Sequence, residues 1–436
     1  MTGVQTCALP ISLANSRLID SDGDGLPNFF DVGGAFTIAP LNLQITGNGT
    51  VSPNFNGAPL IVGQSYTLLA QPLDGSDFEG WSGGIASQAS QLVFTMTTNL
   101  ALKATFTYSP AAASYSGLFY EASGVELLKS GYVNVDVTTK GSYSGVLTIG
   151  NKKYSFKGQM SASGAATNVI ARSSLPTLTA RLQFGDNHIT GTVGDGTWTA
   201  DVAGGRAAFS KATPASFSGK YTIAIPGSGS STNTSQPFGD GYGAVTVNTA
   251  GKIKFKGALA DGTKLSQSAS ANSEKQWPFF ASLYGGTGQI LGWLTFASVD
   301  VQDLGGSLSW VKLPSAAAAY YSGGFDVQSY ARGSSYDGGR QPITGFQSGR
   351  LQLSGGGLAQ SLENGVTISA GNKVGNLGPN KLTLTLNPSQ GTYSATMTDP
   401  NTGKALRANG VMLQKQGIGT GYFLGTSESG RSLLAP

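Results

Sequence analysis

Residues 245–257 read VTVNTAGKIKFKG, and this stretch carries the pattern on which the fold prediction rests. Polar and apolar residues alternate on both sides of a short turn that ends in Gly251. Because successive side chains of a strand point to opposite faces, the alternation predicts two half-buried strands joined by that turn. Ile253 and Phe255 are expected to point inward. The lysines beside them then face solvent: Lys252, Lys254 and Lys256.

The same pattern recurs along the chain, as VDVTTKGSYSG at 135–145 and LTLNPSQGTYSA at 384–395. A second motif, [FY]-S-G-x-[FY], occurs three times, each time after a stretch rich in Pro, Ala and Ser of the kind found in linkers. The motif copies lie at 115–119, 217–221 and 321–325, and the linker-like stretches at 109–114, 212–216 and 313–319. These spacings predict three β repeats, at 114–212, 216–312 and, in a divergent copy, 320–436. Whether the copies are separate domains or share one core is left open.

Composition agrees with an all-β protein. Of 436 residues, only 11% are charged and 64 are Gly, whereas charged residues make up about 25% of an average soluble protein. We therefore predict a small β-rich module followed by three repeated antiparallel β-meander units, each barrel-like or sandwich-like. No run of 18 apolar residues is present, so no transmembrane helix is predicted.

Residues 41–106 differ from the repeats and predict the small module. They contain GNGTV at 47–51, FEGWSGG at 78–84 and FTM at 94–96, set among alternating strands. Gly-Asn-Gly between strands is a hairpin signal, and Trp81 is the expected core aromatic. The combination resembles the divergent internalin-type B repeats, or bacterial repeat domains, of surface proteins. The resemblance implies a β-rich spacer or adhesion module over 36–108, without shared catalytic residues.

Residues 20–31, DSDGDGLPNFFD, have the spacing of a calcium loop within a linker at 13–35. Calcium prefers six to eight oxygen ligands, which alternate side chains around a sharp turn supply. The candidate ligands are the side chains of Asp20, Asp22, Asp24, Asn28 and Asp31 and the carbonyl of Leu26. The loop resembles thrombospondin type 3-like repeats, which implies bound Ca²⁺. The alternative is an acidic linker that binds nothing tightly.

Residue counts exclude several kinds of catalytic site. The chain has one His, His188, and one Cys, Cys7. A site with several His ligands, an internal disulfide and a Cys-rich zinc site are therefore impossible. No GxSxG accompanies His188, so a catalytic triad is not supported. Glu121 and Glu126 flank an expected hairpin and are candidates for a glycosidase pair, but two surface acids are the favoured interpretation. We predict that the protein is not an enzyme.

Residues 1–12, MTGVQTCALPIS, resemble the translated read of a sequencing adapter. We expect that Cys7 is not part of the natural protein. We also expect that the natural start, with any signal peptide, is missing.

The sequence thus predicts a fragment of a large secreted or cell-surface bacterial protein, with structural or adhesive modules and a calcium-stabilised linker. Residues 110–436 carry more Lys and Arg than Asp and Glu, which is compatible with anionic extracellular glycans or cell-wall polymers as partners. A solvated, mildly basic surface without a specific partner is the preferred interpretation. No nucleic-acid-binding motif is present. Two alternatives remain open: a carbohydrate-binding appendage of an upstream enzyme, and an outer-membrane β-barrel.

Overall fold

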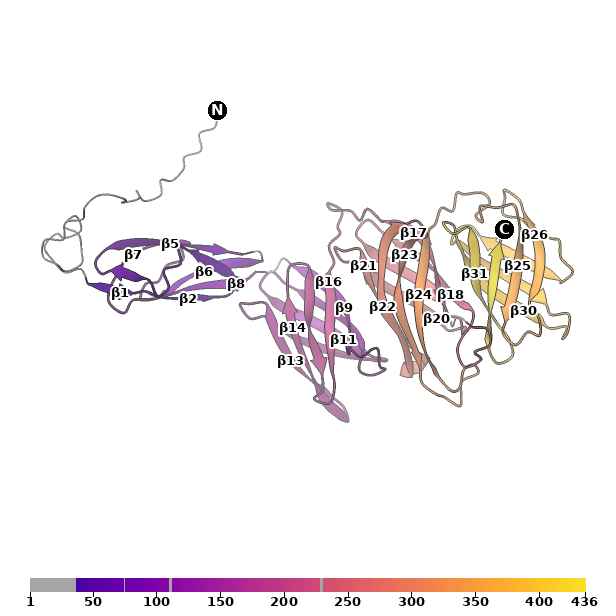
Figure 1. Ribbon diagram of the computed structural model, residues 1–436, viewed down its shortest axis with the longest axis horizontal. Helices are drawn as coiled ribbons and strands as arrows, with labels where there is room; N and C mark the ends of the chain where they lie inside the picture. Colours follow the sequence, from indigo (N-terminus) through magenta and orange to yellow (C-terminus); the bar gives the residue numbers. More distant parts are fainter. Residues whose placement is uncertain (1–36, 74, 110–111, 228–229) are drawn as a thin grey trace, which may run out of the picture. The chain divides into compact units, whose positions relative to one another are not determined.

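The computed structural model describes residues 37–73, 75–109, 112–227 and 230–436 (Figure 1). They form two compact units, one ending at about residue 107 and one running from Tyr108 to Pro436. The all-β prediction is confirmed, since the described residues contain strands and a single 3-10 turn, Tyr284–Gly286. Within these residues, no helix is long and apolar enough to cross a membrane. The calcium loop predicted at 20–31 and the adapter-like residues 1–12 lie outside the described ranges.

The first unit packs two small sheets around one core. One sheet has the order β3-β5-β7 and the other β2-β8-β6, and β1 pairs with β4. The strands are β1 (Ile38–Pro40), β2 (Asn42–Thr46), β3 (Gly49–Ser52), β4 (Pro59–Ile61), β5 (Ser65–Pro72), β6 (Ser76–Gly83), β7 (Gln91–Thr95) and β8 (Ala101–Tyr108). Trp81 is the core aromatic, as predicted; it is buried, and its indole N–H donates to the carbonyl of Ala89 at 3.0 Å.

The hairpin predicted at Gly-Asn-Gly is wrong. β2 and β3, which flank it, belong to different sheets, and β2 pairs in parallel with β8. The two glycines are needed because Phe106 of β8 lies against them. A Cβ on Gly47 would stand 1.9 Å from the Phe106 carbonyl oxygen, and a Cβ on Gly49 would stand 2.4 Å from its ring. A close approach of backbone to a buried ring therefore explains the motif.

The second unit contains three eight-stranded antiparallel sheets, each of which curls into a nearly closed barrel. In each sheet the first strand pairs with the eighth, so the sheet closes there (Figure 1). The first barrel comprises β9 (Ala113–Tyr120), β10 (Gly131–Val137), β11 (Ser142–Ile149), β12 (Lys152–Gln159), β13 (Ala165–Arg172), β14 (Leu175–Phe184), β15 (His188–Gly194) and β16 (Thr199–Arg206).

The second barrel repeats this strand order, and the third differs only in where its sheet ends. The second comprises β17 (Gly219–Pro226), β18 (Asp240–Val247), β19 (Lys252–Ala258), β20 (Lys264–Ser270), β21 (Gln276–Leu283), β22 (Gly288–Val299), β23 (Gln302–Lys312) and β24 (Phe325–Ser335). The third comprises β25 (Ser348–Gly355), β26 (Leu362–Ile368), β27 (Val374–Asn376), β28 (Leu382–Asn387), β29 (Thr392–Thr398), β30 (Ala405–Leu413), β31 (Ile418–Leu424) and β32 (Ser429–Ala435).

Each barrel has an apolar core of its own. The second and third barrels also share a small apolar cluster, in which Ala224 meets Val411 and Leu413. The alternation places these cores as expected: Ile253 and Phe255 are buried, and the lysines that alternate with them are exposed. The interior is filled by large side chains such as Phe119, Trp277 and Phe423, all less than 2% exposed. Packed interiors are typical of eight-stranded barrels of this size.

Each barrel is open at one seam, where the sheet order ends. The seam lies between the fourth and fifth strands in the first and second barrels, but between the third and fourth strands, β27 and β28, in the third. Amide side chains bridge the seam instead of a backbone ladder. In the first barrel Asn168 donates to the carbonyl of Lys157 at 3.1 Å. In the second, Gln267 donates to the carbonyl of Pro278 at 3.1 Å. In the third, Asn364 donates to the carbonyl of Asn380 at 2.5 Å.

The boundary between the second and third barrels differs from the predicted repeat start at 320. The third motif copy, at 321–325, leads into β24, which pairs with β17 and β23 and so completes the second barrel. The third barrel begins at β25. The motif precedes a strand, as expected. Which strands β24 pairs with depends on contacts between residues far apart in the sequence, which the motif does not encode.

The pairing of β24 with the second barrel predicts the result of limited proteolysis. Residues 313–319 are largely exposed, so a protease should cut there early. Because β24 lies after the cut and pairs with two strands before it, the fragments should stay together in native gel filtration and separate only on denaturing gels. Release of a free fragment from about 320 to 436 under native conditions would contradict the observed pairing.

Candidate functional site

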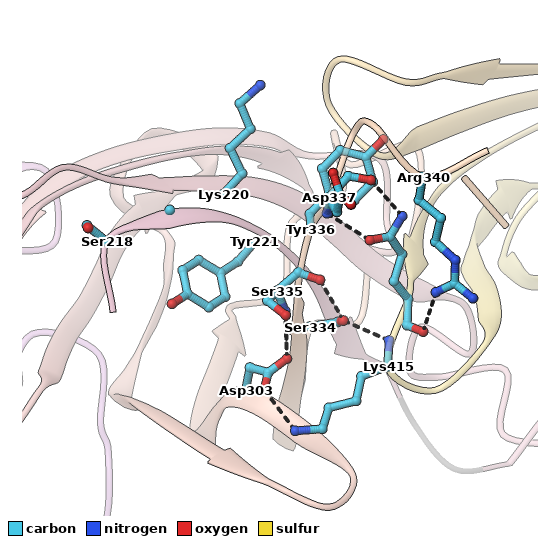
Figure 2. Close-up of a pocket in the computed structure, with 12 residues that line it drawn as sticks. Ser218, Lys220, Tyr221, Asp303, Ser334, Ser335, Tyr336, Asp337, Arg340 and Lys415 are labelled. Carbon is cyan, nitrogen blue, oxygen red and sulfur yellow. Dashed lines mark hydrogen bonds and ion pairs between the residues drawn. The ribbon is translucent and has the colours of Figure 1, made fainter. Parts of the chain in front are cut away.

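The second unit has a cleft of about 570 Å³ between the second and third barrels. β17, β23 and β24 supply one wall, and the turn between β30 and β31 and the segment after β24 supply the other (Figure 2). The residues with polar side chains that line it are Ser218, Lys220, Tyr221, Asp303, Ser334, Ser335, Tyr336, Asp337, Arg340, Gln414 and Lys415.

Lys415 crosses the cleft from the third barrel and binds the second. Its ammonium group lies 2.8 Å from a carboxylate oxygen of Asp303 (Figure 2). The same ammonium group lies 2.9 Å from the hydroxyl of Ser298. Its backbone N–H donates to the hydroxyl of Ser334 at 2.8 Å. Burial alone would raise the pKa of Asp303, but hydrogen bonds from Lys415, Ser298 and Ser335 hold that pKa at about 2. The carboxylate is therefore a fixed anion at neutral pH.

Gln414, the neighbouring residue, fixes the segment that joins the two barrels. Its side-chain amide donates to the carbonyls of Asp337 at 3.0 Å and Ile343 at 3.1 Å. The backbone N–H of Asp337 donates back to the Gln414 side-chain oxygen at 2.8 Å. The turn between β30 and β31 thus holds both the second barrel and the connecting segment.

Asp303 and Tyr336 are poorly suited to proton transfer at neutral pH. A general base works best with a pKa near the working pH, whereas Asp303 stays ionised and burial raises the pKa of Tyr336 to about 12. The serines that line the cleft have no imidazole beside them, because His188 lies at the start of β15 in the first barrel. The described geometry fits a clamp between barrels better than a catalytic centre.

We call the contacts of Gln414 and Lys415 with the second barrel and the connecting segment the clamp. A buried polar contact outside the cleft also joins the two barrels. Asp240, at the start of β18, accepts a hydrogen bond from Thr420 of β31 and one from Arg431 of β32 at 3.2 Å. Burial raises the pKa of Asp240, although Arg431 opposes that shift. Tyr321 binds Ser429 at 2.8 Å in the same interface. The second and third barrels are therefore joined by buried contacts, not only by a linker.

The residues weighed as a glycosidase pair have another role. Glu121 and Glu126 both contact one ammonium group, that of Lys129, at 3.5 Å and 2.8 Å. An ion pair of this kind agrees with the favoured interpretation as surface acids. The predicted calcium ligands at 20–31 lie outside the described residues. Within the described residues, no group of three His, Cys, Asp or Glu side chains could hold a metal ion.

Sequence reasoning missed the residues that join the second and third barrels because nothing local marks them. Asp303 and Lys415 lie 112 positions apart, and Asp240 and Arg431 lie 191 apart. Neither pair falls in a repeat motif. The alternation did identify the exposed lysines of β19, and two of them, Lys254 and Lys256, line a second hollow of about 200 Å³ together with Lys220.

The comparisons with known proteins bear on the first unit. The family model of the divergent InlB B-repeat domain matches residues 40–110, which confirms the resemblance predicted for 41–106. The match does not include residues 20–31, so the thrombospondin-like resemblance gains no support from it. The search of curated proteins found no match.

Two solved structures were compared with the whole chain. The structure of intact Ap-TbpB, with N and C lobes, is 10% identical and covers 89% of this chain and 93% of that chain, with a TM-score of 0.18. A mutant of the vaccine antigen Transferrin Binding Protein B from Haemophilus parasuis Hp5 is 10% identical and covers 74% and 75%, with a TM-score of 0.20. Superpositions this poor do not define a shared fold.

Proposed function

We propose that this chain is a non-catalytic part of a secreted or cell-surface bacterial protein, in which the repeat domain and the barrels act as structural or adhesive modules. The observation that carries the proposal is the match of residues 40–110 to the divergent InlB B-repeat domain, ahead of barrels with filled interiors. A barrel that holds a small ligand keeps an internal cavity. These barrels present their outer surfaces instead, and buried contacts fix the second barrel to the third.

The test is a turnover assay with the purified full chain on polysaccharide, ester and peptide substrates. We expect no turnover above that of a buffer blank. Any activity should be challenged with Glu121→Gln and Glu126→Gln, with His188→Ala as a control in the same barrel. Turnover that either Glu variant abolishes and the His variant keeps would overturn the non-catalytic proposal.

We further propose that residues 20–31 bind Ca²⁺. Calorimetric titration of the full chain should show one weak site, with a dissociation constant on the order of micromolar to millimolar. Asp22→Ala and Asp24→Ala should each abolish the binding heat, because each removes a carboxylate ligand. Asp77→Ala is the matched control, since it removes an exposed carboxylate outside the loop. Equal heats in all variants would show that the loop is only an acidic linker.

A further inference from the structure

The outer surface of β17–β20 carries charge of one sign. Among the described residues of these four strands, every charged side chain exposed to solvent is a lysine: Lys220, Lys252, Lys254, Lys256 and Lys264. Two acids next to these strands, Asp240 and Asp261, are buried and engaged, whereas Asp303 and Asp337 line the cleft that Lys220 borders. Asp240 is held by Arg431, and Asp261, in the turn between β19 and β20, accepts a hydrogen bond from Tyr284 at 2.6 Å. We call this surface the lysine face.

Strand register sets how these lysines are spaced. Lys254 lies opposite Thr246 on one side and Ser268 on the other, and Thr246 in turn lies opposite Lys220. Lys256 likewise lies opposite Ser266. Alternate residues of a strand are about 7 Å apart, so the three lysines of β19 form a row of like charges. Thr246 of β18 and the serines of β20, Ser266 and Ser268, place hydroxyl groups on the two sides of this row.

Part of the lysine face is hollowed. Lys220, Lys254 and Lys256 line the hollow of about 200 Å³, together with Thr246 and residues 389–390 of the third barrel. No acidic side chain is among the described residues that line it. The Lys220 ammonium group donates to the carbonyl of Ser389 at 3.3 Å, so the third barrel helps to fix its position at one end of the face.

The kind of ligand follows from what the face lacks. The aromatic residues of β17 and β19, Tyr221 and Phe255, are buried in the barrel, and Tyr242 of β18 packs against Tyr422. The described face therefore offers no exposed ring, whereas proteins that bind single-stranded nucleic acid stack bases on such rings. Dense positive charge with hydroxyl groups suits a chain that carries carboxylates or sulfates and many hydroxyls.

We propose that the lysine face binds an acidic polysaccharide, recognised by rows of carboxylate or sulfate groups. This inference rests on the proposed function as a surface module and names its partner class. The ligand lies across β17–β20, with its acidic groups on the lysines and its hydroxyl groups on the serines and Thr246. Lys220 and the third barrel border one end of the site.

The experiment uses the full chain with three pairs of measurements. Dextran sulfate is compared with dextran, which has the same backbone without charge, and polygalacturonate is compared with a single-stranded DNA oligomer at the same salt concentration. The triple variant K252Q/K254Q/K256Q removes the row on β19. Its matched control, K152Q/K153Q/K157Q, removes three exposed lysines from β12 in the first barrel. Circular dichroism melts check that both variants fold.

We expect binding to dextran sulfate and polygalacturonate, but not to dextran. The β19 variant should weaken that binding by on the order of tenfold, because three counterion-releasing contacts are lost. The β12 variant should weaken it less than about threefold, through net charge alone.

Equal losses in the two variants, or DNA bound as tightly as polygalacturonate, would overturn the proposal. So would the absence of any binding to either acidic polymer. None of these results touches the non-catalytic proposal, which fails only if the turnover assay is positive.

Discussion

Trp277→Ala should lower the free energy of unfolding of the second unit by about 3–5 kcal/mol, the range for removing a large buried aromatic. Trp277 is fully buried, lies edge-on to Phe279 with ring centroids 5.1 Å apart, and stacks on Phe296. Its indole N–H also donates to Gln267 at 2.9 Å, the residue that bridges the seam of the second barrel. The substitution therefore leaves both a cavity and an unpaired seam amide. A urea melt of the full chain followed by circular dichroism measures the loss.

Trp293→Ala is the matched control for this prediction. Trp293 lies on β22, opposite Pro278 of the strand that carries Trp277, but it is only half-buried and belongs to no core cluster. Its removal should cost less than about 1 kcal/mol. If the two variants lose similar stability, the assignment of Trp277 to the barrel interior is wrong.

Arg431→Met should cost about 3 kcal/mol, because it leaves the buried carboxylate of Asp240 without its cation. The pKa of Asp240 is already raised by burial, so the variant should recover part of the loss as the pH falls and the carboxyl takes up a proton. Melts at several pH values measure this recovery. A loss that stays constant down to pH 4 would mean that the charge of Asp240 is not the cause.

Two further variants separate the buried pair from charge in general. Adding Asp240→Asn to Arg431→Met should restore much of the stability, because the amide is neutral and can still accept the hydrogen bond from Thr420. Arg350→Met removes an exposed arginine whose nearest carboxylate, on Glu363, lies 4.0 Å away. Exposed ion pairs of this kind contribute about 0–1 kcal/mol, so this variant should melt almost like the wild type.

Strand positions and the facing of side chains were predictable from sequence. The alternation at 245–257 placed Ile253 and Phe255 inside and the three lysines outside, and the structure agrees. The period of two in a strand makes this a local property. The B-repeat module was also recognised from its own residues, although its Gly-Asn-Gly step joins two sheets and not two hairpin strands.

The candidate site was predictable only in part, for a physical reason. Lysines exposed on β19 follow from the alternation. The burial of nearby acids depends on contacts outside that strand, of Asp240 with Arg431, 191 positions away, and of Asp261 with Tyr284. The cleft between the barrels depends in the same way on Lys415 reaching Asp303. A sequence pattern within one segment cannot predict a contact between residues that lie so far apart in the chain.

The sequence by itself determined that the chain is all-β, that its strands bury alternate residues and that one motif recurs three times along it. These features follow from backbone geometry and residue type within a few positions of each other. Only the tertiary structure decided which strand closes which barrel. The motif at 321–325 looks like the start of a third repeat, yet β24 completes the second, because an open edge between β17 and β23 leaves unpaired backbone groups that this strand satisfies.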